Sequence, residues 1–558
     1  MEDKQIITVS KVNHYINMTI LLVISLIIFS PLISSKYVWG HDSFYHYANI
    51  FSLVKNVNFL KFKFIPDKIL PIIAYNFGWG EGIFYPSVPQ YSVLYLYKFI
   101  FPIGITNIFT SMKIIHFIMF FLSGITMYVL GLKIYKNDKS ALLCSVFYIT
   151  FPYYYIDIFV RDALNECFLF VFIPLVFLGL EYLYEGNRGK FYLYFVTGYF
   201  FCINCHLVLS VFLTFFVIIY LFFYVKKILN FKIIKSLFIA SLIILGLSSF
   251  FLIPLVMHSV DSGYVVYLKG VMFNYKGISG SMVKIRDFFD FSKPKSWSGI
   301  VLSTTSIPCL IAVIVSIIFI KKNKIRKKLL SFVILIILII YIMNPLFSWK
   351  SIPRFLWNIQ FVWRLNTFLL FFLSLLGGSF IVNIKNNLLK SIIIIFFLVF
   401  STLFVSSFKE MLILENFDVN SFDISKIGAA SFQYIPVNAY NNLEYAKERS
   451  DDVIVVSGNA KIDNVYSNTP YLSFYVKTDG ARLELPRYYF KIYDIIANGK
   501  KIKYKENDKG FIEIYLKRNS SVVIRENSRL AISCIIIFIV SLILFLYSLF
   551  KNRIEDIK

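Results

Sequence analysis

The sequence predicts a polytopic α-helical membrane protein with a β domain outside the bilayer, placed before the last helix. Two observations lead to this prediction. The 558 residues are 58% hydrophobic and only 16% charged, whereas a soluble domain has about 25% charged residues. The apolar residues also form long blocks, and roughly a dozen stretches approach the 20 or so apolar residues that a bilayer span needs. A soluble globular protein is therefore excluded.

The positive charge of the chain indicates loop orientation and not nucleic-acid binding. The formal net charge is +25, but the basic residues gather in short connections between apolar runs. This is the positive-inside pattern, which places those connections in the cytoplasm. A nucleic-acid partner, which needs a continuous basic face on a folded domain, is not expected. The basic clusters are Lys133–Lys139, Arg188–Lys190, Lys226–Lys235, Lys321–Lys328, Lys385–Lys390 and Lys551–Arg553.

With the basic connections inside, the chain crosses the bilayer about twelve times and both termini lie in the cytoplasm. No short basic loop then falls on the outer side. The predicted spans are 15–34, 106–132, 140–154, 163–183, 190–205, 207–225, 233–257, 299–320, 329–346, 361–384, 389–408 and 528–550.

The apolar run 88–101 is too short to span comfortably, and Pro102 and Gly104 interrupt the chain directly after it. If this run crossed the bilayer, every later loop would be inverted against the positive-inside pattern. We therefore expect an interfacial or re-entrant helix there.

Five segments face outward in this threading, and the longest has the length of a domain. Its later part alternates apolar and polar residues with a period of two, and the runs are separated by the turn signals Thr478-Asp-Gly, Ala497-Asn-Gly and Asn507-Asp-Lys-Gly. We expect an antiparallel β module there, built as a small sandwich. The outward segments are 35–105, 155–162, 258–298, 345–360 and 409–527. The chain then divides into a transmembrane domain (1–408), the β domain (409–527) and a final helix with its tail (528–558).

The first outer loop opens with one carboxylate, Asp42, between two histidines, His41 and His46. On a helix Asp42 and His46 would share a face, and an acid beside an imidazole suits a general base or a metal site. Hydrogen bonding at the membrane interface is the alternative. Further along, Gly78–Pro86 is rich in glycine and aromatic residues, with Glu81 as its only carboxylate. Such aromatic faces suit sugar rings or prenyl chains, and equally the interfacial aromatic belt.

The second candidate group is Asp157–Glu166, at the outer mouth of a predicted span. Asp157 and Arg161 lie one helical turn apart, as do Asp162 and Glu166. Ionisable residues that enter a membrane helix are costly and therefore suggest function. The alternative is an Asp157–Arg161 ion pair that serves only the interface.

The third candidate group lies in 353–366, where Gln360 and Arg364 would share a helical face at the mouth of a span, with Arg354 upstream. Arginine binds phosphate through two parallel hydrogen bonds, and a wall of low dielectric strengthens that interaction. A snorkelling arginine is the alternative.

Four motifs occur here in order: G-H-D-x-x-x-H at Gly40–His46, the Tyr85-Pro86 pair, R-x-A-x-x-E at Arg161–Glu166, and Q-x-x-W-R at Gln360–Arg364. Over nearly the whole chain they are similar to the bacterial integral membrane family labelled 6-pyruvoyl-tetrahydropterin-synthase-related. That family resembles the GT-C class of membrane glycosyltransferases. The resemblance implies a GT-C-like fold in a bacterial plasma membrane.

The resemblance also implies roles for the motif residues. Asp42 would be the catalytic base or a metal-binding carboxylate, assisted by His46 or Glu81. Arg161 and Arg364 would bind the donor's lipid phosphate, with Gln360 and Arg354 nearby. His41, Glu166 and Asp162 would support the site. Magnesium or manganese could bind at Asp42 and His46, although the sequence does not establish any cofactor.

Two positions depart from the family pattern: Asp162 replaces the usual small residue after the arginine, and Val362 replaces the usual proline. Because Asp162 adds negative charge beside a proposed phosphate ligand, Arg161 could be held in a salt bridge instead.

These features lead us to expect an inverting glycosyltransferase. It would move a sugar from a polyprenyl-phosphate donor to an extracytoplasmic acceptor, a cell-envelope glycan or polymer. A flippase for a lipid-linked sugar is the first alternative, but it should carry polar residues through the middle of several helices, and these helix centres are almost wholly apolar. The second alternative is a non-catalytic envelope assembly protein that docks through 409–527.

Overall fold

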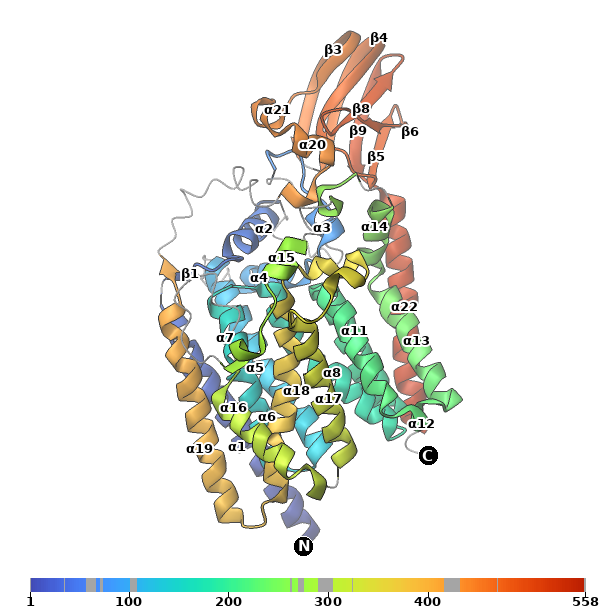
Figure 1. Cartoon of the computed structure of the whole chain (residues 1–558). Helices are drawn as coiled ribbons and strands as arrows, with labels where there is room; N and C mark the ends of the chain where they lie inside the picture. Colours follow the sequence, from blue (N-terminus) through green and yellow to red (C-terminus); the bar gives the residue numbers. More distant parts are fainter. Residues whose placement is uncertain are drawn as a thin grey trace.

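The structure is a computed structural model in which a bundle of helices carries a β module at one end (Figure 1). Both chain termini lie toward the opposite end of the bundle. The structure describes residues 2–34, 36–56, 67–70, 74–100, 108–260, 263–268, 275–289, 305–323, 325–415, 432–468 and 470–555.

The bundle is built from the apolar runs of the sequence, since a helix satisfies its own backbone hydrogen bonds where no water is present. Polar caps mark several starts: the Asn137 side chain accepts from the Ser140 amide, and Asn386 does the same for Leu389. The main helices are α1 (Glu2–Phe29), α5 (Ile108–Tyr135), α6 (Asp138–Ile149), α7 (Pro152–Phe159), α8 (Leu164–Tyr184), α10 (Thr197–Cys205), α11 (Leu207–Phe222), α13 (Phe231–Leu247), α14 (Ser249–Ser259), α16 (Ile307–Ile318), α17 (Arg326–Met343), α18 (Asn366–Gly378), α19 (Asn387–Ser406) and α22 (Ser528–Glu555).

Within the described part of the chain, six helices are long and apolar enough to cross a bilayer, which indicates a membrane protein. The number rises to eight if two bent pairs each count as one span: α6 with α7, bent by 45°, and α13 with α14, bent by 77°. The helices α11 and α16 are apolar but shorter. The structure thus agrees with a multi-span membrane protein, while the arrangement with twelve spans stays a prediction.

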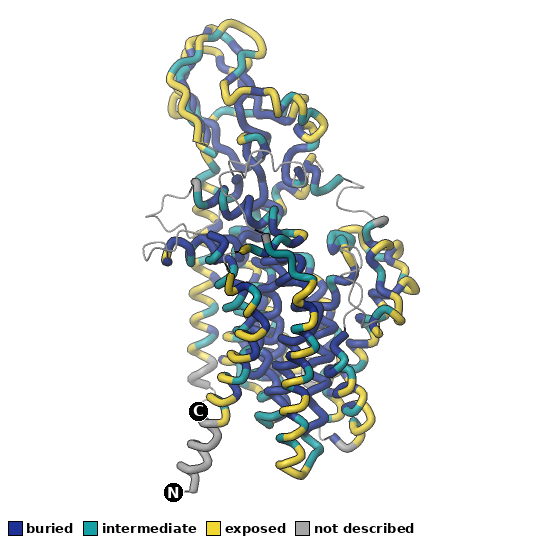
Figure 2. The backbone as a smooth tube through the Cα atoms, turned by 90° about the vertical axis from the view of Figure 1, so that its left-hand side faces the viewer, coloured by how far each residue is buried: buried dark blue, intermediate teal, exposed yellow. Residues whose placement is uncertain are grey.

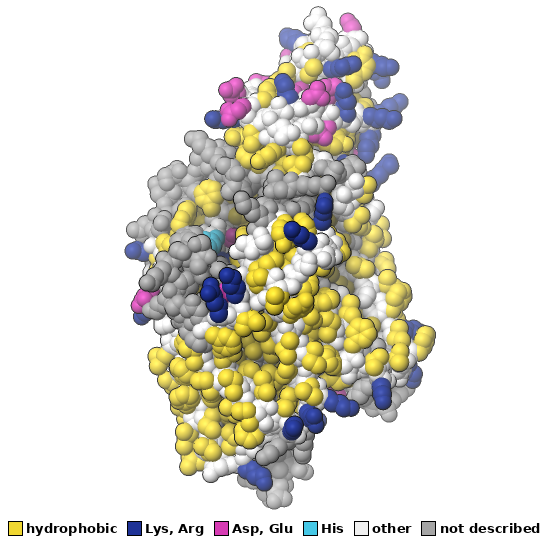
Figure 3. Space-filling model, in the orientation of Figure 1, with side chains coloured by type: hydrophobic (Ala, Val, Ile, Leu, Met, Phe, Trp, Pro, Cys, Tyr) yellow, Lys and Arg dark blue, Asp and Glu magenta, His cyan; other side chains and the backbone are white. Residues whose placement is uncertain are grey.

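The surface of the bundle agrees with this interpretation. Figure 3 shows hydrophobic side chains covering the bundle, with Lys and Arg side chains gathered at its lower end and around the β module above. Figure 2 shows that the buried residues run along the bundle axis and continue into the junction with the β module.

The β module is one antiparallel sheet of seven strands. It is curved into a half-barrel, so the expected small sandwich was wrong. Its neighbours run in the order β6-β5-β9-β4-β8-β7, and β3 pairs with β4. Long β4 serves both halves of the sheet, pairing with β9 along its first part and with β8 along its second. The strands are β3 (Ile454–Asn468), β4 (Tyr471–Tyr488), β5 (Tyr493–Ala497), β6 (Lys500–Lys501), β7 (Lys505–Glu506), β8 (Phe511–Leu516) and β9 (Ser520–Glu526).

Two of the three predicted turns are confirmed. Asn498 and Gly499 have φ angles of 48° and 77°, which suits the tight turn between β5 and β6. Gly510 also has a positive φ, and it lies between β7 and β8. The predicted turn at Thr478-Asp-Gly480 was wrong, because these residues lie inside β4 where its register with β3 shifts. Asp479 and Gly480 belong to a β-bulge in β4 and not to a turn between two strands.

The first outer loop packs between the bundle and the β module. It contains α2 (Ser43–Asn56), α3 (Glu81–Phe84) and α4 (Val88–Ile100). Phe77 and Trp79 share a hydrophobic core with the β module, and the Tyr488 amide donates to the Phe77 carbonyl at 2.9 Å. A two-residue ladder joins β1 (Tyr37–Val38) to β2 (Leu414–Glu415). Segments far apart in the chain therefore enclose this loop.

Helix α4 covers most of the predicted interfacial run 88–101. Its 13 residues give a length of about 20 Å, less than the 30 Å or so of the hydrocarbon core, and it is not among the candidate spans. Its continuation at 101–107 lies outside the described residues. The polar side chain of Gln90 in α4 reaches the region of the candidate site.

Candidate functional site

The three candidate groups of the sequence converge beneath the β module, beginning with a backbone contact between the first two. The Asp42 amide donates to the Arg161 carbonyl at 2.8 Å. Gly40 allows this approach, since a Cβ atom there would lie 2.6 Å from the carbonyl oxygen of Val160 and the carbonyl carbon of Arg161. The glycine thus brings the Asp42 turn against the end of α7.

Arg161 lies at the centre of a buried ionic cluster. Its guanidinium makes two contacts of 3.0 Å with the Glu166 carboxylate and one of 3.1 Å with Asp42, and it also pairs with Asp157. The Trp363 ring covers it, with the guanidinium carbon 4.6 Å from the ring centre. The side chain is only 3% exposed, whereas that of Asp42 is 36% exposed. The presence of Asp162 in the motif suggested that Arg161 is held in a salt bridge. Arg161 is held in this way, but its partners are Asp42, Asp157 and Glu166 and not Asp162.

Asp162 itself points away from this cluster. It has a φ of 58°, and its carboxylate accepts from the Ser43 hydroxyl at 2.6 Å, with His116 Nδ1 3.8 Å away. Burial raises the pKa of Asp162 well above its usual value. Asp162 therefore ties the start of α2 to the turn before α8.

Glu166 links Arg161 to the third candidate group, 353–366. Its Oε1 lies 2.8 Å from the Nε of Arg364, and Arg364 Nη1 donates to the Gln360 side chain at 2.9 Å. Gln360 and Arg364 do meet, but not on one helical face. A short helical segment, η8 (Arg354–Ile359), ends at Gln360, where φ is 61°, and another, η9 (Val362–Leu365), follows.

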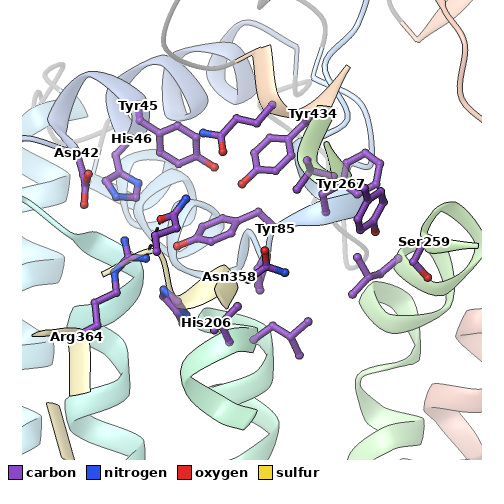
Figure 4. A pocket seen from close by; sticks show the side chains of 18 of the residues that line it. Asp42, Tyr45, His46, Tyr85, His206, Ser259, Tyr267, Asn358, Arg364 and Tyr434 are labelled. Atoms are coloured by element: carbon purple, nitrogen blue, oxygen red, sulfur yellow. Dashed lines mark hydrogen bonds between the residues drawn. The ribbon is translucent and has the colours of Figure 1, made fainter. Parts of the chain in front are cut away.

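A cavity of about 470 Å³ lies against this cluster. Figure 4 shows Asp42, His46 and Arg364 at one end, Tyr45, Tyr85, Tyr434 and Asn358 in the middle, and Tyr267 and Ser259 at the other end. Leu255 and Val256 lie one helical turn before Ser259 in α14, and Leu207 and Val208 follow His206 at the start of α11; all four side chains line the cavity. The cavity therefore has charged side chains at one end, and its wall includes apolar side chains of these two helices.

Four of the residues selected from the sequence line the cavity together with Asp42: His41, His46, Gln360 and Arg364. The His46 side chain is buried, and its Nδ1 lies 3.3 Å from the side-chain amide nitrogen (Nε2) of Gln90. Burial lowers the pKa of His46 to about 4, so its imidazole is neutral near pH 7.

Glu81 lies behind the cavity wall and not in it. Its carboxyl accepts hydrogen bonds from Tyr45 at 3.2 Å and from Asn49 at 3.3 Å, and the residue is 1% exposed. Burial raises the pKa of Glu81 to about 8, so the group is mostly protonated at neutral pH. This position suits orientation of the Tyr45 ring.

Arg354, the remaining candidate, is exposed at the start of η8 and does not line the cavity. Arg161, Glu166 and Asp162 also lie outside its lining, in the layer just behind. Of the proposed phosphate ligands, the structure thus brings Arg364 and Gln360 to the cavity surface.

Several lining residues had been given no role from the sequence. Tyr434 comes from the segment before the β module, and its carbonyl accepts from the Gly80 amide at 3.2 Å. Asn358 and Gln433 add amide groups, and His206 lies 3.9 Å from Glu166. The Tyr85-Pro86 motif pointed to Tyr85, but no local pattern marks Tyr434, which reaches the site only through tertiary packing.

Within the described residues, no group of three or more His, Cys, Asp and Glu side chains is arranged to hold a metal ion. Asp42 and His46 nevertheless face the same cavity. The magnesium or manganese site expected there stays a prediction.

The chain matches no protein-family model, and no similar sequence was found among curated proteins.

Proposed function

We propose that the chain is a membrane glycosyltransferase that moves a sugar from a polyprenyl-phosphate donor to an acceptor outside the cytoplasm. One observation carries the proposal. A carboxylate, Asp42, and a guanidinium, Arg364, line the same cavity, and the wall of that cavity includes apolar side chains of α11 and α14. A sugar phosphate on a lipid needs all three: a base, a cation and room for a hydrocarbon chain.

The apolar side chains of the cavity wall offer a route for the lipid chain. They come from two helices, α11 through Leu207 and Val208, and α14 through Leu255 and Val256. Val256 is 59% exposed on a helix whose outer surface is apolar. A chain that lies in the bilayer could enter between these helices while its phosphate reaches the polar end.

We assign the donor phosphate to Arg364, supported by Gln360. Arg364 lines the cavity, whereas Arg161 is already bound to three carboxylates and covered by Trp363. The role of Arg161 is then to position: it holds Asp42 and Glu166, and Glu166 in turn holds Arg364. A positioned cation stabilises the negative charge that develops on the leaving phosphate.

The reaction then needs one base. The acceptor hydroxyl oxygen attacks the anomeric carbon, the bond from that carbon to the phosphate oxygen breaks, and the electron pair leaves with the phosphate. The hydroxyl proton passes to Asp42, and the neutral imidazole of His46 can assist. A direct attack of this kind inverts the configuration at the anomeric carbon. Magnesium or manganese at Asp42 and His46 would add positive charge near the phosphate.

The topology is part of the proposal. Twelve spans would place both termini and the basic connections in the cytoplasm of a bacterium, and the β module and the cavity outside. The acceptor would then be a glycan or polymer of the cell envelope.

Replacing Asp42 by Asn tests the proposal directly. The change keeps the shape and removes the base, so transfer should fall by roughly 10²- to 10⁴-fold without loss of folded protein. The purified protein would be incubated with a labelled polyprenyl-phosphate sugar and acceptor, and Asp508→Asn, on the exposed face of the β module, is the matched control. Full transfer by the Asp42 variant would contradict the assignment.

The same assay separates the rival functions. Label that crosses a vesicle bilayer without reaching an acceptor would indicate a flippase. Binding of a wall polymer with neither transfer nor translocation would indicate an assembly protein.

A further inference from the structure

A second hollow, separate from the cavity, lies at the base of the β module. Its volume is about 580 Å³ and its wall consists of three lysines, three tyrosines and an isoleucine. These are Tyr489, Lys491, Tyr493, Lys501, Ile502, Lys503 and Tyr504, which we call the lysine–tyrosine groove. The proposed glycosyl transfer makes no use of it.

The groove is close to the expected level of the lipid headgroups. Tyr493 pairs with Glu526 in the sheet, and the Asn527 amide donates to the Ile492 carbonyl, just before α22 begins at Ser528. Ile532, the first strongly exposed apolar residue of α22, is 55% exposed and lies about 8 Å further along the helix. The polar layer on each side of the hydrocarbon is about 5–8 Å thick. Figure 1 shows β5 directly above the upper end of α22.

The charge of the groove is positive. Lys501 pairs with Asp494, and Lys491 and Lys503 add two more ammonium groups to the wall. Figure 3 shows Lys and Arg side chains along the edge of the β module above the hydrophobic surface of the bundle. Basic groups at this level attract anionic headgroups.

The tyrosines give the groove a fixed shape. The Tyr504 hydroxyl lies 3.0 Å from the Phe490 carbonyl oxygen and 3.2 Å from that of Tyr493, which holds its ring in place. Tyrosine and lysine together are also the residues favoured at a membrane interface.

We propose that the lysine–tyrosine groove binds the headgroup of an anionic phospholipid in the outer leaflet. The lipid phosphate lies among the lysine ammonium groups, and its chains lie beside the apolar surface of α22. The bound lipid would anchor the β module to the bilayer surface above the cavity. This binding does not depend on the proposed transfer reaction.

The test uses the full-length protein purified in detergent and counts bound phospholipids by native mass spectrometry. Phosphatidylglycerol should be retained at least tenfold better than phosphatidylcholine. The triple change Lys491→Gln, Lys501→Gln, Lys503→Gln should abolish retention of one phosphatidylglycerol molecule. The matched control is Lys461→Gln, Lys477→Gln, Lys517→Gln, which removes the same charge from exposed positions elsewhere on the sheet; it should retain that molecule.

Equal retention of the two lipids by the unchanged protein would overturn the proposal, even if the triple variant does not fold. Unchanged retention in a folded triple variant would also overturn it. A third arm adds soluble polyphosphate. If polyphosphate displaces phosphatidylglycerol and binds the unchanged protein but not the triple variant, the groove serves a soluble polyanion and not a lipid.

Discussion

At the scale of single residues, the two arginines of the site have different environments, although the sequence led us to expect that both bind phosphate. Arg161 is enclosed by Asp42, Asp157 and Glu166, while Arg364 lines the cavity and shares Glu166. A buried cation that neutralises several carboxylates mainly supports the structure. A cation at a cavity surface can still bind an incoming anion.

This difference predicts opposite effects of the same substitution. Arg364→Lys should raise the donor KM about tenfold or more, because lysine lacks the planar fork that holds phosphate, and should lower the melting temperature less than Arg161→Lys does, since Arg364 pairs with one carboxylate and Arg161 with three. Arg161→Lys should mainly lower the melting temperature, since disrupting a buried ion pair costs roughly 3–5 kcal/mol.

Steady-state kinetics and thermal unfolding in detergent would measure both effects, with exposed Lys350→Gln as the control for charge. A higher KM with normal stability in Arg161→Lys, and an unchanged KM in Arg364→Lys, would restore Arg161 as the phosphate ligand.

At the scale of elements, the site depends on where helices stop. The break before Pro152 bends α6 against α7 by 45°, because proline has no amide to donate and clashes with the preceding turn. The chain then turns at Val160–Ala163 before α8 starts. Arg161 lies in that turn, so its carbonyl is available to the Asp42 amide.

The packing of the Asp42 turn predicts that Gly40→Ala impairs both activity and stability. A Cβ atom would meet backbone atoms of Val160 and Arg161 at 2.6 Å, which would push the turn away and weaken the bond from the Asp42 amide. Overpacking of this kind typically costs about 1–3 kcal/mol, and turnover should fall as Asp42 shifts. Gly280→Ala is the control, since a Cβ there would meet nothing within 4 Å. A Gly40→Ala protein that melts and turns over like the original would show that this close approach is dispensable.

The helices and strands also show how much of the fold could be predicted from the sequence. Long apolar runs predicted the helices, and the alternating runs predicted β4 and β8 but neither β3 nor β9. The predicted turn at Asn498-Gly499 joins β5 to β6. The groups that form the site were also visible as unusual polar residues at helix mouths. The break at Gln360 was not visible, because the spacing of Gln360 and Arg364 equally suits one helical face. The bulge at Asp479 resembled a turn for the same reason: its residues favour both.

Local sequence patterns could not predict which residues would contact one another in the folded chain. Nothing near Glu81 indicates that Tyr45 and Asn49 will cover it, and nothing near Tyr434 indicates that it will complete a cavity with residues from the first loop. Such pairings depend on how the β module packs on the bundle, which is a property of the whole chain.

At the scale of the whole molecule, the basic connections and the β module occupy opposite ends of the bundle (Figure 1). This arrangement predicts opposite accessibility of two added cysteines. Lys517→Cys, on the β module, should react with a membrane-impermeant maleimide in intact cells, and Lys385→Cys, in a basic connection, only after permeabilisation. All six native cysteines are buried, so the unchanged protein supplies a low background. Labelling of both positions, or of Lys385→Cys alone, in intact cells would refute the predicted orientation.

The contacts of the first loop with late segments of the chain have a consequence for biosynthesis. The Trp39 amide donates to the Ile413 carbonyl, β1 pairs with β2, and Tyr434 forms part of the cavity wall. A nascent polypeptide whose early helices have already entered the bilayer still lacks this wall and the strand that pairs with its first loop. The cavity wall can be completed only after the ribosome has delivered the chain as far as residue 434. Premature termination anywhere before this point would therefore leave a protein without this part of the cavity wall.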